Sequence, residues 1–542
     1  MILLLNLNQK ATLSYWLLFG LIFSSACQGS QESATESQAA SQPNIIFIMS
    51  DDHTTQAFGT YGSRLAALNP TPVLDELAAE GMVFDQAFCH NSICTPSRAN
   101  IITGQYSQTN GVLDLDGVLP IEKQYLPIEM KGLGYQTAII GKWHLKEEPA
   151  NFDHYEVLPG QGKYFDPEFR KKGEGSWPEN MVAYEGHSSD IITDRTLDWL
   201  ENRRNKDQPF FLMHHYKAPH DDFEFAPRYA DYLEDTEIPE PASLYEQPDF
   251  GSEATMGKND SLIHRIGTSV SDRHTYRSYV QQYGFEAANR KEATHLAYQE
   301  YLKRYLRCVK GVDDNLGRLF TYLKENDLWE NTVIIYTGDQ GFMLGEHDYM
   351  DKRWMYDESM RMPFIVHYPK VVKAGSRSDV IINNTDYGPT MLELAGGQVP
   401  DYMQGESFAD VLKGETTEGK QTATYYRYWM HLMHHDVPAH FGLRTKDYKL
   451  IFYYGLPSDM NSIGKATMPW MDESYSIEQT PAAWEFYDLS QDPEEVHNRY
   501  NDPAYQDIIA QLKQELKEKR GALHETDADF PHIQEVIDAH WD

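Results

Sequence analysis

Cysteine is scarce in this chain, which excludes a fold held together mainly by disulfide bonds. Only four cysteines occur among 542 residues, whereas scaffolds that depend on disulfides are dense in cysteine. Each cysteine therefore needs its own explanation. Cys27 and Cys94 stand in motifs, while Cys89 and Cys308 are left as either one bridge or two buried thiols.

Long hydrophobic runs are missing beyond the N-terminus, which excludes a bundle of membrane-spanning helices. The mean hydropathy is -0.58, a value typical of a soluble globular protein. No internal apolar stretch approaches the roughly 20 residues that a spanning helix needs. The length exceeds the size at which one core stops growing, so we expect a large domain with a smaller one.

Positive charge is in short supply, and this limits the possible partners. Lysine and arginine number 47 against 82 aspartates and glutamates, a net charge of -35. Nucleic acid and anionic lipid surfaces are therefore disfavoured as partners. A negatively charged substrate is compatible with this charge only if cations gather in one pocket and salt screens the rest. A saline habitat and an ordinary acidic exported protein both remain open.

The first 42 residues resemble an export segment followed by a tether. Residues 1–27 contain an apolar core from Leu13 to Phe23 and small residues before Cys27, the layout of a signal peptide. Cys27 stands where a bacterial lipobox carries its acylated cysteine, although Ser24 replaces the usual leucine. We expect an exported protein, either a membrane-anchored lipoprotein or periplasmic, with secretion as the alternative. Residues 28–42 predict a flexible linker.

Apolar runs alternate with helical patterns through most of the chain. The helical patterns include Tyr298 to Leu323, and a helix capped by Ser188 or Ser189. Near-continuous apolar runs are typical of parallel strands covered on both faces. The alternation predicts an α/β fold with a mixed, largely parallel sheet between helices, over a domain at 43–415. The predicted strands are residues 44–49, 136–140, 209–213, 332–336 and 363–366.

The C-terminal part has a different pattern. Residues 422–428, 440–444 and 448–453 alternate in the manner of antiparallel strands. A helix is predicted over 503–520. We therefore expect a smaller subdomain at 416–542, built on an antiparallel sheet.

Polar clusters follow four of the predicted strands. Ligands of open parallel sheets bind at the carboxyl ends of the strands, where successive loops converge. The sequence therefore predicts one site that gathers all four clusters. Their members are Asp51 and Asp52, Lys142 and His144, Lys217 and His220, and Asp339 and Gln340.

The acidic members of these clusters predict a metal site. Three carboxylates and one amide offer hard oxygen ligands, which suit calcium or magnesium better than zinc. Calcium is favoured because it accepts an irregular shell of about 6 to 8 oxygens. Asp313 and Asp314 also form an acidic pair, but they fall on the long amphipathic helix, away from the strand ends, and we interpret them as structural. The predicted ligands are Asp51, Asp52, Asp339 and Gln340.

The run Cys94-Thr95-Pro96-Ser97-Arg98-Ala99, followed by Thr103-Gly104, resembles the signature of the type I sulfatases. These formylglycine-dependent enzymes belong to the alkaline phosphatase superfamily, and the resemblance extends from about Asn44 to Lys352. It implies that a formylglycine-generating maturation enzyme oxidises Cys94 to formylglycine (3-oxoalanine). It also implies that residue 94 joins the ligands of one Ca²⁺. Gln340 departs from the family pattern, because many members carry Asn or His there.

The resemblance also implies roles for the other polar residues. Arg98 would hold the hydrated aldehyde, and Lys142 and Lys352 would meet the sulfate oxygens as charges. His220 would protonate the leaving sugar oxygen, since histidine can donate at mild pH. His144 would take a proton from the second hydroxyl, which expels sulfate and restores the aldehyde.

Several further residues are predicted to contact the substrate. His215 and Lys217 flank the same strand end, and His434 and His435 approach from the C-terminal subdomain. A metal cluster that includes His431 is the weaker alternative, because neither spacing nor cysteines support zinc. The aromatic segment 221–289 suits sugar rings as well as ordinary packing.

The resemblance implies a sulfate ester as the substrate, and export together with the aromatic residues indicates an extracellular glycan as its carrier. An algal polysaccharide such as ulvan or carrageenan is favoured. The alternative is an N-acetylglucosamine-6-sulfatase that acts on mucin or glycosaminoglycan. Two rival classes are a phosphatase or phosphonate hydrolase, which commonly uses Ser or Thr with two metals, and a non-catalytic glycan-binding surface lipoprotein.

Overall fold

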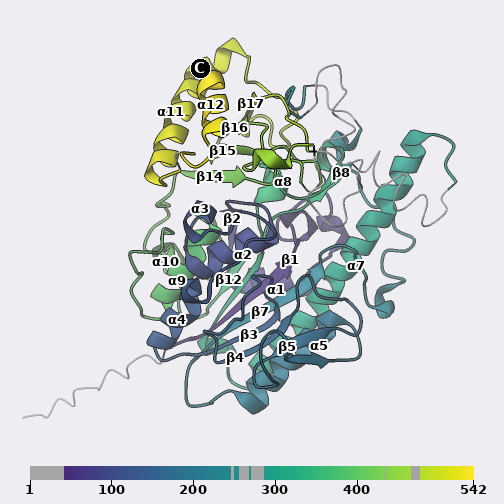
Figure 1. Ribbon diagram of the computed structural model, residues 1–542. Coiled ribbons are helices and arrows are strands. Elements are labelled where there is room, and N and C mark those ends of the chain that lie inside the picture. Colours follow the sequence, from purple (N-terminus) through teal and green to yellow (C-terminus); the bar gives the residue numbers. More distant parts are fainter. Residues whose placement is uncertain are drawn as a thin grey trace, which may run out of the picture. The chain divides into compact units, whose positions relative to one another are not determined.

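A ten-stranded mixed sheet forms the centre of the larger part of the fold (Figure 1). Its strand order is β13-β2-β12-β9-β1-β7-β3-β4-β5-β6. The strands are β1 (Asn44–Asp51), β2 (Met82–Phe88), β3 (Gln136–Lys142), β4 (His154–Leu158), β5 (Glu168–Lys171), β6 (Met181–Ala183), β7 (Phe210–Pro219), β9 (Thr332–Gly338), β12 (Phe364–His367) and β13 (Ser376–Asn383).

The computed structural model describes residues 42–245, 249–255, 268–269, 286–433, 435–464, 477–525 and 527–542. The predicted signal peptide at 1–27, its Cys27, and the linker at 28–42 except Gln42 lie outside the described residues. So do His434 and much of the aromatic segment 221–289. Among the described residues, no helix is long and apolar enough to cross a membrane.

All five predicted strands are present, and the centre of the sheet is parallel. β1 is buried along its whole length and pairs in parallel with β7 and β9. Its apolar run suits a strand covered on both faces. β12 differs, because it runs antiparallel to both β9 and β2. Between β9 and β12 the chain forms only one short α-helix, α8 (Asp357–Met360), whereas a parallel crossover usually needs a full helix.

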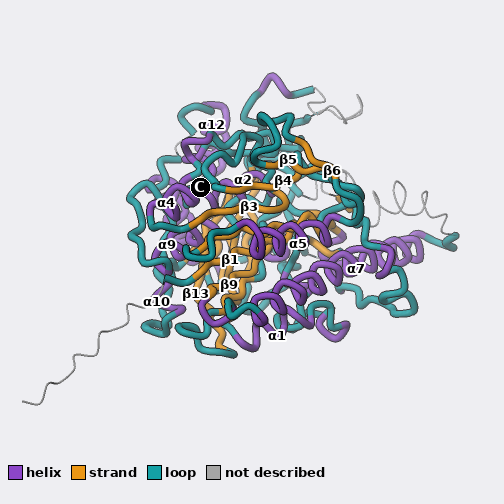
Figure 2. Tube along the Cα trace, turned by 90° about the horizontal axis from the view of Figure 1, so that it is seen from below, coloured by secondary structure: helices purple, strands orange, loops and turns teal. Residues whose placement is uncertain are grey.

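Helices cover both faces of this sheet, as Figures 1 and 2 show. Alternate residues of β1 enter two different hydrophobic cores, Ile46 and Ile48 on one face and Phe47 and Met49 on the other, as the period of a strand requires. The first core contains α1 (Pro72–Glu80), α5 (Ser188–Asp198) and α7 (Arg290–Glu325), and the second contains α2 (Cys94–Thr103), α4 (Tyr125–Gly132) and α9 (Tyr387–Leu394).

The two unassigned cysteines belong to opposite faces of the sheet. Cys89 lies in the core with α2, whereas Cys308 lies in the core with α7. Both are buried free thiols. The sequence leaves open either one disulfide bridge or two buried thiols, and the structure has two buried thiols.

Among the described α-helices, α5 and α7 begin at a residue whose side chain caps the helix, and the cap of α5 corrects a prediction. α7 begins after Asn289, whose side chain accepts a hydrogen bond from the Glu292 amide at 3.1 Å. For α5 we predicted Ser188 or Ser189 as the cap, but the capping residue is His187. Its Nδ1 accepts from the Ser189 amide at 3.3 Å. A neutral imidazole nitrogen can fill the role that hydroxyls and carboxylates usually fill.

A separate four-stranded antiparallel sheet forms in the C-terminal part, in the order β14-β15-β16-β17. The predicted final helix begins as a 3-10 turn at Pro503–Tyr505 and continues as α11. The domain boundary near residue 415 stays a prediction. The elements are β14 (Ala423–Tyr428), β15 (His440–Thr445), β16 (Tyr448–Tyr453), β17 (Ala483–Asp488), α11 (Gln506–Ala522) and α12 (Pro531–His540).

Short elements complete the described fold. A three-stranded sheet in the order β10-β11-β8 contains two strands, β10 and β11, from the segment between β9 and β12. Its strands are β8 (Thr268–Ser269), β10 (Met343–Leu344) and β11 (Tyr349–Asp351), and the remaining short helices are α3 (Ser107–Asn110) and α10 (Ala409–Leu412).

Candidate active site

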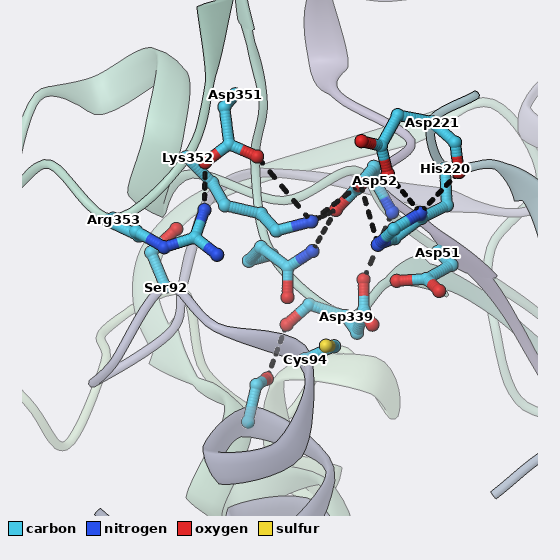
Figure 3. A network of polar contacts seen from close by, with 12 residues as sticks. Asp51, Asp52, Ser92, Cys94, His220, Asp221, Asp339, Asp351, Lys352 and Arg353 are labelled. Atoms are coloured by element: carbon cyan, nitrogen blue, oxygen red, sulfur yellow. Dashed lines mark hydrogen bonds and ion pairs between the residues drawn. The ribbon is translucent and has the colours of Figure 1, made fainter. Parts of the chain in front are cut away.

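Polar side chains from four strand ends meet at the carboxyl edge of the sheet, as the sequence predicts. Figure 3 shows those that follow β1, β7 and β9. Asp51 ends β1 and Lys142 ends β3, while His220 and Asp339 directly follow β7 and β9. Possible ligand atoms of Asp51, Asp52 and His220 all lie within 4.8 Å of one another. The topology of the parallel strands therefore produces one centre from segments almost 300 residues apart.

Two buried oxygens at this centre fit a hard cation. Asp51 Oδ1 and Gln340 Oε1 are buried without a hydrogen-bond partner among the described residues. Buried polar atoms are normally satisfied, and carboxylate and amide oxygens are the ligands that calcium prefers. Asp52 lies beside them, and the Gln340 amide nitrogen donates to its carboxylate. The donor set therefore fits a calcium-type ion.

Asp339 contributes differently from the other predicted ligands, because both of its oxygens accept hydrogen bonds. Oδ1 accepts from the Asp52 amide at 3.1 Å, and Oδ2 accepts from Arg98 Nη2 at 2.9 Å. Burial and then the charge of Asp51 raise the pKa of Asp339 to about 8. Burial opposes ionisation of Asp51 too, but the charge of Lys142 holds its pKa well below the usual range. A cation nearby would favour the ionised form of both carboxyls.

Cys94 is the first residue of α2 and is fully buried at the floor of the site. Its Sγ lies 3.2 Å from His144 Nδ1. Burial raises the pKa of the Cys94 thiol. A thiol that stays protonated is a poor nucleophile, so the encoded side chain is badly suited to attack a sulfate ester.

Three cationic side chains contact the carboxylates of the site, those of Arg98, Lys142 and Lys352. Arg98, one helical turn after Cys94, also donates through Nη1 to the Lys142 carbonyl at 2.7 Å. Lys142 is fully buried and forms an ion pair with Asp51. Lys352 Nζ lies 2.6 Å from Asp52 Oδ2. The positive charges of these side chains offset the negative charges of three buried carboxylates, which would otherwise repel one another.

The two predicted catalytic histidines have different environments. His220 Nδ1 lies 2.7 Å from the Asp221 carbonyl, and its Nε2 lies 3.8 Å from Asp52 Oδ2. His144 adopts a left-handed conformation with φ of 56°. Burial, with the charge of Lys142 second, lowers the pKa of His144 well below its ordinary value. His144 is therefore a neutral imidazole beside residue 94.

A cavity of about 520 Å³ opens above Cys94. Lys217, His220, Lys352 and His435 line it, as do His144 and Cys94. Lys142 does not line the cavity, because its ammonium is engaged with Asp51 beneath the floor. The role of Lys142 as a charge that meets sulfate oxygens stays a prediction.

The substrate contact through His215 also stays a prediction. Its ring is buried in β7, with Nδ1 3.1 Å from the Lys142 carbonyl, and it is not part of the cavity wall.

Two other residues named in the sequence analysis lie in structural surroundings. His431 is buried, and its Nε2 lies 2.8 Å from the Glu478 carbonyl. Asp313 caps α1, accepting from the Leu74 amide at 3.0 Å, which agrees with the structural interpretation of that aspartate.

Sequence reasoning missed several residues of the cavity wall. Asp351 and Arg353 form an ion pair on either side of Lys352, and both have positive φ angles, 78° and 87°. Because Asp351 and Arg353 flank Lys352, which is itself predicted, this adjacency in the sequence could have identified them. Gln161 and Asp116 come from loops without a motif, so no pattern pointed to them.

Comparison with known proteins agrees with this site. A family model described as sulfatase matches residues 43–397, and one described as N-sulphoglucosamine sulphohydrolase, C-terminal, matches 345–468 and 473–522. An N-acetylglucosamine-6-O-sulfatase of Bacteroides thetaiotaomicron is 37% identical over 540 residues, covering 93% of this chain and 90% of that protein. An ulvan-active sulfatase of Formosa agariphila is 25% identical, covering 90% and 82%.

One solved structure is similar throughout. It is the structure of a protein in complex with its substrate D-glucosamine-2-N,6-O-disulfate. The TM-score is 0.76 and the sequence identity is 35%, and the match covers 90% of this chain and 99% of that one. The mixed sheet with its flanking helices and the site at its edge define an alkaline-phosphatase-like hydrolase fold. The chain belongs to the sulfatase family. It is a bacterial sulfuric ester hydrolase that acts on sulfated glycans.

Proposed function

We propose that the enzyme hydrolyses the 6-O-sulfate ester of N-acetylglucosamine or a closely related glucosamine. The observation that carries this proposal is the 37% identity to an N-acetylglucosamine-6-O-sulfatase over nearly the full length of both chains. The bound glucosamine disulfate of the similar structure supports the same sugar. The proposal therefore takes up the alternative given under the sequence analysis, the N-acetylglucosamine-6-sulfatase, in preference to an algal glycan as substrate.

A sulfate ester of ulvan or carrageenan is the second candidate. The acidic composition supports it, as does the resemblance to an ulvan-active sulfatase over 90% of the chain. The identity of that relative, at 25%, is lower than that of the first.

The proposed chemistry starts at residue 94. When oxidised to formylglycine, this residue supplies a hydrated aldehyde as the nucleophile. When bound by Asp51, Asp52, Gln340 and residue 94, with Asp339 beside them, Ca²⁺ supplies Lewis-acid stabilisation of negative charge.

The chain's own side chains supply the remaining steps. Lys352 faces the cavity and can neutralise sulfate oxygens there. Arg98 and Lys142 act from beneath by holding Asp339 and Asp51 in place. His220 donates a proton from Nε2 to the leaving sugar oxygen, and its orientation is set by the bond from Nδ1 to the Asp221 carbonyl. His144, neutral and 3.2 Å from Sγ of residue 94, is placed to take the proton of the second hydroxyl of the hydrated aldehyde, which would restore the aldehyde as the C–O bond to sulfate breaks.

The Asp351–Arg353 pair and His435 give the cavity wall a polar side. We propose that sugar hydroxyls contact this side, together with Lys217. The proposed setting is export through residues 1–27, with Cys27 as a lipid anchor or a periplasmic location, and plain secretion as the alternative. A maturation enzyme that generates formylglycine is the proposed partner in that pathway.

Sulfate release across a substrate panel tests the proposed function. The panel contains 6-O-sulfated N-acetylglucosamine, glucosamine-2-N,6-O-disulfate, and oligosaccharides of ulvan and carrageenan, with Cys94→Ala as the blank. Release should be fastest from a 6-O-sulfated glucosamine. Release from an algal oligosaccharide alone would establish the second candidate instead.

A further inference from the structure

Asp52 adopts a left-handed conformation directly after β1 ends. Its φ is 67°, a region that residues other than glycine rarely adopt. Successive side chains of an extended strand point to opposite faces, so a strand continued through Asp52 would separate its carboxylate from that of Asp51. The left-handed turn ends the strand, and oxygens of both aspartates lie within 4.8 Å of each other. The cation site therefore depends on this turn.

Hydrogen bonds hold the peptide groups on both sides of Asp52. Its N–H donates to Asp339 Oδ1 at 3.1 Å. Its carbonyl accepts from the Tyr305 hydroxyl at 2.7 Å. The same hydroxyl oxygen accepts from the Thr54 amide at 3.2 Å. One phenol thus bridges two backbone groups of the turn, and strained conformations of this kind persist only when their surroundings fix them.

Tyr305 is itself held rigidly on α7. The side chain is fully buried. Its ring stacks on Phe342, with centroids 5.8 Å apart and planes at 7°, and meets Phe223 edge-on at 5.9 Å. The hydroxyl therefore has a fixed position relative to the sheet, and the turn must conform to it.

The same helix offers a matched control one turn earlier. Tyr301 is also fully buried, and its hydroxyl donates to the Met343 carbonyl at 2.7 Å. Met343 belongs to β10 and is not among the predicted ligands. Tyr301 and Tyr305 thus make equivalent tyrosine-to-carbonyl hydrogen bonds from one helix, and only the bond from Tyr305 reaches a proposed ligand.

We propose that Tyr305 is a positioning residue of the cation site, whose hydroxyl fixes the left-handed peptide of Asp52 and so aims the Asp52 carboxylate at the ion. This inference rests on the proposed function, because it takes calcium binding at Asp51, Asp52 and Gln340 as given. Partners outside the ligand shell that orient a ligand commonly change metal affinity about 10- to 100-fold when they are removed.

Calcium titration of three proteins tests the inference. Wild type, Tyr305→Phe and Tyr301→Phe are stripped with a chelator, dialysed, and titrated with calcium chloride in a calorimeter. Both variants keep the ring and lose one buried hydroxyl. The urea midpoint in chelator should fall further in Tyr305→Phe, because its hydroxyl makes two backbone hydrogen bonds, whereas that of Tyr301 makes the one to Met343. Tyr305→Phe should bind calcium about 10- to 100-fold more weakly than wild type. Tyr301→Phe should stay within about threefold of wild type.

The outcomes separate this inference from the proposed function. Wild-type protein that binds no calcium would remove the proposed cation site, and the role of Tyr305 with it. Calcium binding that is unchanged in Tyr305→Phe, or weakened equally in both variants, would overturn the role of Tyr305 and leave the cation site intact. If Tyr305→Phe folds only with calcium, its unfolding midpoint as a function of calcium concentration yields the same dissociation constant.

Discussion

The position of His220 fits two different roles, that of a general acid and that of a metal ligand. One ring nitrogen contacts Asp221, and the other lies among the possible metal ligands, 3.8 Å from Asp52 Oδ2. The proposed function makes His220 the general acid. The grouping of its ring nitrogen with two aspartates also fits a metal ligand. Substitution by alanine distinguishes the two.

The expected effect of His220→Ala depends on the leaving group. General acid catalysis typically contributes about 10²- to 10⁴-fold, which corresponds to roughly 3 to 5 kcal/mol of activation free energy. A sugar alkoxide is a poor leaving group and needs the proton, so kcat on a sugar sulfate should fall by that factor. An activated aryl sulfate leaves without a proton, so its kcat should fall by less than about tenfold.

Steady-state kinetics on both substrates, with calcium affinity measured on the same preparation, provides the test. The general-acid role predicts unequal losses and unchanged calcium affinity. Equal losses on both substrates, accompanied by weaker calcium binding, would refute the reasoning and make His220 a ligand.

Two further predictions concern the scaffold. Gly141 has φ of 109°, and an added Cβ would lie 1.8 Å from the His215 carbonyl oxygen. The substitution Gly141→Ala should therefore lower the free energy of unfolding by about 2 to 4 kcal/mol, because of steric overlap and backbone strain. Gly132→Ala meets no atom within 4 Å and is the control in urea unfolding; equal midpoints for the two variants would contradict this account of β3. Burial raises the pKa of Asp313 to about 7, above its value of 3.8 in an unfolded chain, so the folded state keeps a proton that the unfolded state releases. The stability that this group contributes is fully present below about pH 4 and is lost as the pH rises to about 7. The unfolding midpoint of wild type should therefore decline relative to that of Asp313→Asn over this range, and parallel pH profiles would show that Asp313 does not titrate in this way.

The central sheet and the meeting point of its loops were predictable because their signals are local. The apolar runs of β1, β3, β7 and β9 each mark a buried strand, and a parallel arrangement then brings the residues after those strands together. The positions of Asp51 and Asp339 follow from this topology. The direction of β12 did not follow, since an apolar run predicts burial and carries no information about the orientation of its neighbours.

Side-chain direction was the part that the sequence could not provide. Lys142 and His215 lie on neighbouring parallel strands, but their side chains point beneath the cavity floor, the first toward Asp51 and the second toward the Lys142 carbonyl. The cap of α5 was also misassigned, because the ring of His187 replaces a serine hydroxyl. Arg353 joins the cavity wall through a positive φ angle that no residue pattern indicates for arginine.

The chemical state of residue 94 tests the central claim most directly. The protein is produced in a host that contains the maturation enzyme, and the peptide that includes residue 94 is analysed by mass spectrometry alongside sulfate release from the same preparation. The account predicts an aldehyde in place of the thiol, with specific activity proportional to the converted fraction. Full activity in protein whose Cys94 is entirely an unmodified thiol would contradict it.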